Sequence, residues 1–132
     1  MKIEEMMIEI GLKYTSELIV TEEVTAAAIG SGDLPVLATP MMMALMEHAA
    51  MLAVKDYLPE GQTTVGGHIA SSHLKPSRIG EVVRAEAEVI KVEGRKITFR
   101  VAAYAGDTLI GEGTHLRFMV DRERFMATDE RK

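Results

Sequence analysis

The sequence predicts an α+β protein in which a curled antiparallel sheet covers one long apolar helix. Residues 41–54 form an apolar run that only Glu47 and His48 interrupt, which is typical of a helix buried on most sides. Four strand-like runs follow, and short turns at Gly94 and Gly106 predict that the last three form an antiparallel meander. A helix that is apolar nearly all round needs a sheet that wraps around it.

The segment before the long helix predicts a strand, a short helix and a loop. Residues 13–20 are rich in Tyr, Thr, Ile and Val, as strands are. Thr21 followed by two glutamates predicts the N-cap of a short helix that reaches Ile29. The polar run at residues 30–33 then breaks this helix, and residues 34–38 are expected to be a loop.

The boundaries of the long helix follow from its flanking residues. Thr39 is a favourable N-cap, and Pro40 then takes the first helical position. The helix is expected to end between Lys55 and Leu58, before Pro59. The strands after it are predicted at residues 63–74, 81–92, 95–105 and 108–120.

Length and composition narrow the class of protein. The 132 residues are expected to form a single domain, residues 1–132, and cysteine is absent, so no disulfide or thiol chemistry is predicted. A net charge of −5 with dispersed charges argues against a nucleic-acid partner. The apolar run is too short to span a membrane, and the first ten residues lack the pattern of a signal peptide. We therefore expect a cytoplasmic protein without a membrane or nucleic-acid partner.

Thr39 and Glu47 are the first candidates for a functional site. Eight residues separate them, so they share a helix face to within about 80°. A carboxylate on an apolar helix is costly unless it is paired or used, and it can act as a general base or as a nucleophile. The alternatives are a Glu47 satisfied by backbone donors and a Thr39 that only caps the helix.

The first strand after the helix carries a second group of candidates. Gly66 and Gly67 indicate a bulge or a close approach of the backbone to a ligand, where an N–H group could bind an oxyanion. His73 lies on the opposite face from Gly66 if the strand is regular. Both residues can therefore serve one site only if a bulge intervenes.

Basic residues and histidines complete the candidates. Lys75 and Arg78 follow this strand, and Arg117 lies in the last strand. Each of these three side chains could bind a phosphate group or could be an ordinary solvated surface residue. The four histidines lack the spacing of a metal-binding helix, so neither a metal nor another cofactor is expected. One edge of the curled sheet would stay open, which predicts a homodimer, or a tetramer built from it.

Several short motifs together resemble the hot-dog-fold acyl-CoA thioesterases, in particular the fluoroacetyl-CoA thioesterase-like family. The resemblance runs from about Gly11 to Phe125. It rests on Ala38-Thr39-Pro40-Met41, Leu45-Met46-Glu47, Val65-Gly66-Gly67, Ser72-His73, Val92-Glu93-Gly94-Arg95 and the run from Gly111 to Arg117. It is interrupted at residues 30–33, where small and polar residues replace the family's bulky, Phe-containing lid.

The resemblance implies a fold, an activity and roles for the candidate residues. Thr39, Glu47 and His73 match the family's catalytic Thr, Glu and His. Gly66 matches the glycine whose N–H polarises the thioester carbonyl, and Arg117 matches an arginine near the site. The family needs no metal or redox cofactor and is dimeric, with active sites at the subunit interface.

The expected function is hydrolysis of a short-chain acyl-CoA to the free acid and CoA. Glu47 would act as nucleophile or general base, His73 would protonate the leaving thiolate or activate water, and Lys75 with Arg78 would contact CoA. One alternative is a non-catalytic module that binds an acyl-CoA or a similar small apolar ligand. Another is a hot-dog hydratase-dehydratase, which usually needs an Asp with a nearby His, whereas Asp33 has no His in the five residues after it.

Overall fold

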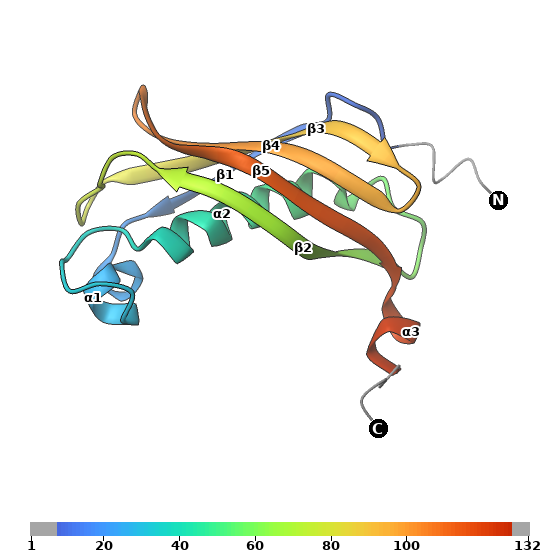
Figure 1. Cartoon of the computed structure of the whole chain (residues 1–132), viewed down its shortest axis with the longest axis horizontal. Coiled ribbons are helices and arrows are strands. Elements are labelled where there is room, and N and C mark those ends of the chain that lie inside the picture. Colours follow the sequence, from blue (N-terminus) through green and yellow to red (C-terminus); the bar gives the residue numbers. More distant parts are fainter. Residues whose placement is uncertain (1–7, 128–132) are drawn as a thin grey trace.

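A computed structural model describes residues 8–127 of the chain and shows one curled sheet around a central helix (Figure 1). The five strands are all antiparallel and lie in the order β1-β3-β4-β5-β2. Their bounds are β1 Lys13–Ile19, β2 Gln62–His73, β3 Val82–Glu93, β4 Lys96–Ala105 and β5 Thr108–Asp121. The predicted fold class is therefore confirmed, and so is the meander of the last three strands.

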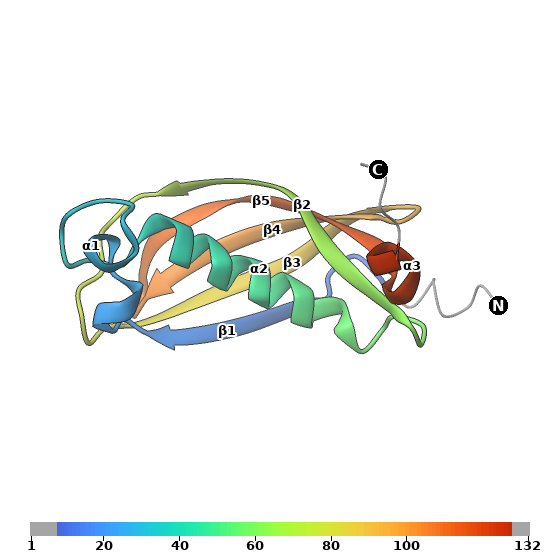
Figure 2. The same cartoon turned by 90° about the horizontal axis from the view of Figure 1, so that it is seen from below.

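Helix α2, Thr39–Lys55, lies across the concave face of the sheet (Figure 2). Its apolar residues meet the inward-facing residues of β3 and β4, which alternate with outward-facing ones as predicted. Fully buried residues include Met42, Met46, Ala50 and Val54 on the helix, and Val83, Ala85, Ala87, Val89, Ile97, Phe99, Val101 and Ala103 on the strands. Burial of these side chains is the main favourable contribution to the fold.

The start of α2 differs from the prediction by one residue. Ala38 is the N-cap, whereas Thr39 is the first helical residue and makes no side-chain capping bond. Ala38 is fully buried and accepts hydrogen bonds from the N–H groups of Met41 and Met42. The Thr39 hydroxyl is therefore free to bond elsewhere.

The predicted single helix between Thr21 and Ile29 is also wrong. A 3-10 helix at Glu22–Val24 precedes a separate short helix, α1 at Ala26–Ile29. Thr25 divides them, because its hydroxyl donates to the Glu22 carbonyl and accepts from the Ala28 N–H. Thr25, and not Thr21, is thus the residue whose side chain caps a helix.

A bulge in β2 lets both halves of this strand serve the helix side of the sheet. Gly66 is opposite Arg117 and His68 is opposite Leu116, so Gly67 is the extra residue. The bulge shifts the alternation, and Thr64 and Gly66 before it therefore share a face with Ser71 and His73 after it. This fulfils the condition under which Gly66 and His73 can serve one site.

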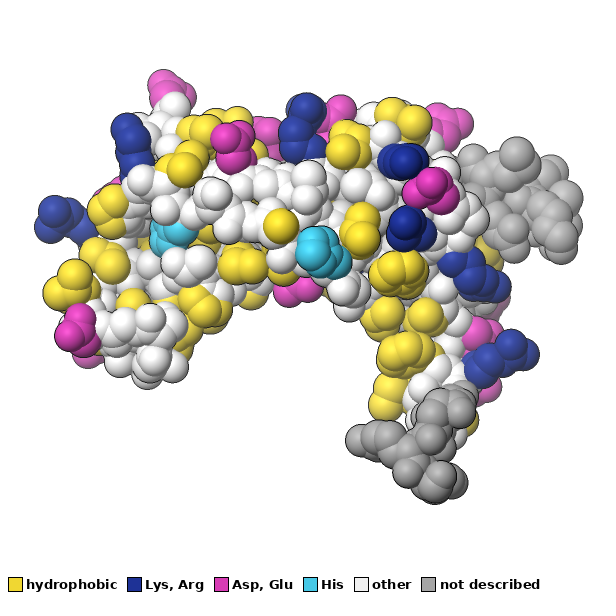
Figure 3. Space-filling model, viewed as in Figure 1, with side chains coloured by type: hydrophobic (Ala, Val, Ile, Leu, Met, Phe, Trp, Pro, Cys, Tyr) yellow, Lys and Arg dark blue, Asp and Glu magenta, His cyan; other side chains and the backbone are white. Residues whose placement is uncertain are grey.

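Beyond β5 the chain turns into α3, Arg122–Ala127, which points away from the sheet (Figure 1). In the space-filling view the surface is arched between the end that carries α1 and the end that carries α3 (Figure 3). No helix among residues 8–127 is long and apolar enough to cross a membrane.

Candidate active site

Thr39 and His73 form a hydrogen-bonded pair at the start of α2. The Thr39 Oγ1 lies 2.8 Å from the His73 Nδ1, although the two residues are 34 positions apart. Thr39 belongs to the first turn of the helix and His73 ends β2, so the sheet curvature brings them together. Two of the predicted catalytic residues therefore meet in the structure.

The environment of His73 favours its neutral form. Its other ring nitrogen, Nε2, is buried and has no hydrogen-bond partner among the described residues. Burial lowers the pKa of His73 below the ordinary value of 6.5, and the backbone of Lys75 acts weakly in the opposite direction. A neutral imidazole can accept a proton from the Thr39 hydroxyl or from water.

A pocket of about 300 Å³ opens beside this pair. Its lining mixes an apolar wall with a few polar side chains, as ligand pockets do. The polar residues are Thr39, His73, Lys75 and Ser31, and the apolar ones are Ala26, Val36, Leu37, Leu74 and Pro76. Ser31 comes from the polar loop that the sequence singled out.

Glu47 belongs to a second group, two turns further along α2. The helical rise places it about 12 Å from Thr39 along the axis. Its carboxylate is directed at Gly66, where an added Cβ would lie 2.6 Å from Oε2. The absence of a side chain at Gly66 thus makes the space that this carboxylate occupies, and the Glu47 side chain is still 43% exposed.

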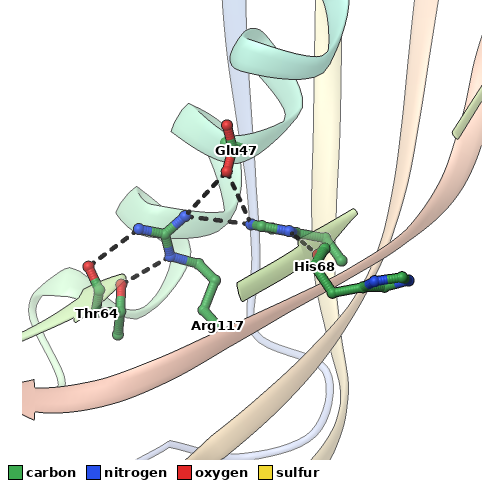
Figure 4. Close-up of polar contacts among 5 residues, drawn as sticks. Glu47, Thr64, His68 and Arg117 are labelled. Carbon is green, nitrogen blue, oxygen red and sulfur yellow. Dashed lines mark hydrogen bonds and ion pairs between the residues drawn. The ribbon is translucent and has the colours of Figure 1, made fainter. Parts of the chain in front are cut away.

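Arg117 lies beneath the Glu47 carboxylate (Figure 4), and His115 is a second neighbour of this carboxylate. Oε2 of Glu47 is 4.0 Å from Nη1 of Arg117 and 3.9 Å from Nε2 of His115. Arg117 also donates from Nε to the Thr64 hydroxyl at 2.8 Å and from Nη2 to the Thr64 carbonyl at 3.1 Å. These bonds satisfy a cation that is only 7% exposed.

Protonation within this group follows from its hydrogen bonds. Nδ1 of His115 lies 2.8 Å from the His68 carbonyl, which can only accept, so Nδ1 carries the proton. Burial is the main cause that lowers the pKa of His115, whereas Glu47 raises it. Burial also lowers the pKa of Arg117, but a guanidinium keeps its charge in proteins.

The remaining predicted residues lie outside these two groups. A Cβ on Gly67 would meet the ring of Phe118, on the side away from Glu47. Lys75 lines the pocket, whereas Arg78 does not, and the backbone N–H of Arg78 bonds to Glu81. Among residues 8–127 no cluster of three His, Asp or Glu could hold a metal ion.

The sequence interpretation missed His115 and Thr64 as members of the site. His115 and Arg117 are two residues apart on β5, so the alternation of a strand predicts that they share a face. Thr64 stands two residues before Gly66 on β2 and shares its face for the same reason. A search for same-face neighbours of the predicted residues would therefore have found both.

Solved structures with the same architecture define the class of the protein. A hot-dog-like protein from Thermanaerovibrio acidaminovorans superposes with a TM-score of 0.85 over 96% of this chain and 93% of its own, at 20% identity, which bears on the fold alone. A thioesterase-superfamily member from Thermus thermophilus is 31% identical, with a TM-score of 0.84 over 91% of this chain and 89% of its own. The protein is a thioesterase with a hot-dog-like fold.

More specific matches identify the family. Residues 20–123 match the model of the fluoroacetyl-CoA-specific thioesterase family, FlK. A fluoroacetyl-CoA thioesterase from Streptantibioticus cattleyicolor is 38% identical over 97 residues, which are 74% of this chain and 70% of that protein. A Thr-to-Ser mutant of FlK in complex with acetyl-CoA is 31% identical, with a TM-score of 0.86 over 91% of this chain and 95% of its own. The chain belongs to the fluoroacetyl-CoA-specific thioesterase family.

Replacement of Gly66 by alanine tests the contact with Glu47. The new Cβ would lie 2.6 Å from Oε2 of Glu47 and 3.4 Å from Nη1 of Arg117, so the carboxylate must move. We expect Gly66→Ala to lower thioesterase turnover roughly 100-fold, since a displacement of about 1 Å can have this effect. Steady-state kinetics measure it, with Ser72→Ala as a control because Ser72 is exposed on the same strand. Equal turnover in wild type and Gly66→Ala would contradict the contact.

Acid should destabilise the protein through the half-buried His73 and the fully buried His115. The pKa values of His73 and His115 lie below 6.5 in the folded chain, so the unfolded chain binds more protons as the pH falls through this value. The free energy of unfolding should therefore be lower at about pH 5.5 than at about pH 7.5 in urea titrations. His115→Gln should make this dependence shallower, and an unchanged slope in that variant would count against the neutral form of His115.

Proposed function

We propose that the protein hydrolyses short-chain acyl-CoA thioesters to the free acid and CoA. The observation that carries the proposal is the Thr39–His73 pair on the wall of the pocket, in a chain of a thioesterase family. The Glu47 carboxylate supplies the nucleophile or base that acyl transfer requires, and the exposed backbone of Gly66 beside it supplies a hydrogen-bond donor. Family membership favours this reaction over a binding module and over a hydratase.

In the proposed reaction, polarisation of the thioester carbonyl comes first. The N–H of Gly66 donates to the carbonyl oxygen, where negative charge develops in the transition state. Glu47 either attacks the carbonyl carbon or removes a proton from the attacking water. The ion pair with Arg117 keeps the Glu47 carboxylate in place for either role.

His73 and Thr39 act on the protons in this proposal. Burial lowers the pKa of His73, so its ring is neutral and can accept a proton at neutral pH. If Glu47 attacks, the carbon–sulfur bond breaks to give the CoA thiolate and an anhydride of Glu47 with the acyl group. His73 then accepts a proton, directly or through the Thr39 hydroxyl, from the water that cleaves the anhydride, and this proton passes to the thiolate. If Glu47 instead removes the proton from the attacking water, the carbon–sulfur bond breaks as the hydroxide adds, and that proton passes through Thr39 and His73 to the thiolate. In either route water supplies the hydroxyl of the acid and the proton of the CoA thiol.

The pocket beside Thr39 is proposed to take the acyl group. A water molecule occupies about 30 Å³ in the liquid, so a pocket of about 300 Å³ is larger than a two-carbon acyl group needs. Ser31 lines it where a bulky lid would narrow it. We therefore expect the pocket to accept acetyl and somewhat longer short-chain groups without a preference for fluorine. Lys75 lines the pocket, and we expect it to contact the CoA part of the substrate together with Arg78, which lies three residues further along the chain.

The separation of the two groups supports a site shared between two copies of the chain. Within residues 8–127 no hydrogen bond or ion pair joins Glu47 to Thr39 or His73, and the two groups lie about 12 Å apart along α2. Antiparallel pairing of two β2 edges would bring the His73 end of one strand towards the Gly66 region of the other. One thioester could then contact Thr39 and His73 of one subunit and Glu47 of the partner subunit.

The β2 edge is suited to such pairing. It lies at one end of the strand order and contains twelve residues without any Asp, Glu, Lys or Arg. Protein edges that must stay unpaired usually carry charges, whereas the other edge strand, β1, does contain Lys13 and Glu17. The face of the molecule on which β2 lies shows histidine and hydrophobic side chains (Figure 3). We propose a homodimer that pairs through β2.

Replacement of Glu47 by glutamine tests the reaction. The amide cannot act as nucleophile or base, so we expect kcat to fall at least about 100-fold. Release of free thiol is measured with DTNB on acetyl-, fluoroacetyl-, butyryl- and hexanoyl-CoA. Glu112→Gln is the control, because Glu112 is exposed on β5. Unchanged thiol release in Glu47→Gln would contradict the role of Glu47, and a wild-type protein that binds these thioesters without releasing thiol would contradict the function.

Mixing two inactive variants tests the shared site. Thr39→Ala and Glu47→Gln homodimers each lack one half of every site. After subunit exchange half of the dimers are mixed, and each mixed dimer contains one intact shared site, so roughly a quarter of wild-type activity should return. Sedimentation confirms dimer formation, and each variant exchanged with itself is the control. If dimers mix but no activity returns, each site lies within one chain.

A further inference from the structure

His115 is the one polar side chain of the site that is fully buried, and no step of the proposed reaction uses it. The ring of Phe99 lies beside it, 6.1 Å between centroids. Each of its ring nitrogens has a defined partner. Nδ1 donates to the His68 carbonyl at 2.8 Å, and Nε2 faces Nη1 of Arg117 at 3.2 Å. A buried imidazole with both nitrogens engaged holds one orientation.

The direction of the bond to Arg117 is fixed by chemistry. A guanidinium can only donate, so Nε2 of His115 must accept and the ring must be neutral. The other nitrogens of Arg117, Nε and Nη2, are both hydrogen-bonded to Thr64. Nη1 lies near two groups at once, the imidazole at 3.2 Å and the Glu47 carboxylate at 4.0 Å.

We propose that His115 is a positioning residue, which as a neutral hydrogen-bond acceptor orients Arg117 and through it holds the Glu47 carboxylate against Gly66. The proposal rests on the proposed function, since it assigns a task to the same carboxylate. Thr64 fixes two nitrogens of the guanidinium, and His115 fixes the third. Arg117 is then a positioning residue as well, because all its nitrogens are directed at protein groups.

Protonation of His115 would reverse its effect on Glu47. An N–H at Nε2 would point at the guanidinium, 3.2 Å away, and would compete with it for the carboxylate. The titratable or charged groups that face this ring are Arg117, Glu47 and His68. Burial, Arg117 and the His68 side chain disfavour a positive ring, whereas the His68 carbonyl and Glu47 favour it. The acid limb of the activity should therefore contain the titration of His115 beside that of His73.

The experiment compares His115→Gln, Glu47→Gln and the double variant. Glutamine keeps a donor and an acceptor but lacks the rigid ring, so we expect kcat of His115→Gln to fall roughly tenfold to 100-fold, with KM little changed. Since His115 acts through Glu47, the double variant should be no slower than Glu47→Gln alone. Effects that multiply in the double variant would overturn the proposal, because His115 would then act independently of the carboxylate.

Two further measurements test the protonation state and the role of His115. The log kcat/KM profile of His115→Gln should lose one titrating group from its acid limb, and an unchanged limb would overturn the proposal. Nitrogen NMR of the wild type should show the Nδ1–H tautomer of His115, which does not depend on any variant folding. His48→Gln is the matched control, since His48 contacts Ser16 on the far edge strand. Full activity of Glu47→Gln would overturn the proposed task of His115 together with that of Glu47. A wild-type protein that binds acyl-CoA without releasing thiol, while NMR shows this tautomer, would contradict the proposed function and not the geometry of His115.

Discussion

The close approach of the α2 helix to β2 at Gly66 is the constraint on which the site depends. A Cβ at this position would collide with the Glu47 carboxylate, so only glycine lets the carboxylate lie against the sheet. The adjacent bulge at Gly67 then shifts the alternation of β2, and His73 thereby turns to the helix side. A regular strand without glycine would have closed the space for Glu47 and turned His73 to the outer face.

The charges of the site are arranged in layers from the core outwards. The neutral His115 lies deepest, the guanidinium of Arg117 lies above it, and the partly exposed Glu47 carboxylate comes last. Thr64 and His115 satisfy the buried cation, which would otherwise be costly. This order leaves the carboxylate as the charged group that reaches solvent.

Much of the fold could be predicted because its signals are local or periodic. The alternation along β3 and β4 and the apolar run of α2 each identify a buried face without knowledge of the partner. The helix starts were harder, because they depend on contacts made elsewhere in the chain. Thr39 matches an N-cap in sequence, but Ala38 fits the buried cap position and the Thr39 hydroxyl bonds to His73.

The members of the site could be predicted from the sequence, but not how they are grouped. Only the curvature of the sheet determines that Thr39 meets His73 and that Glu47 meets Arg117. The role of His115 is hidden in the sequence because its bond to the His68 carbonyl joins residues 47 positions apart.

The start of α2 is held by burial and not by a side-chain cap. A side-chain cap usually contributes about 1 kcal/mol to a helix, and α2 begins without one, since Ala38 has no hydroxyl and that of Thr39 bonds to His73. The first turn is therefore held by the burial of Leu37, Ala38 and Met42. The same buried residues thus support both the end of the helix and the position of the hydroxyl that bonds to His73.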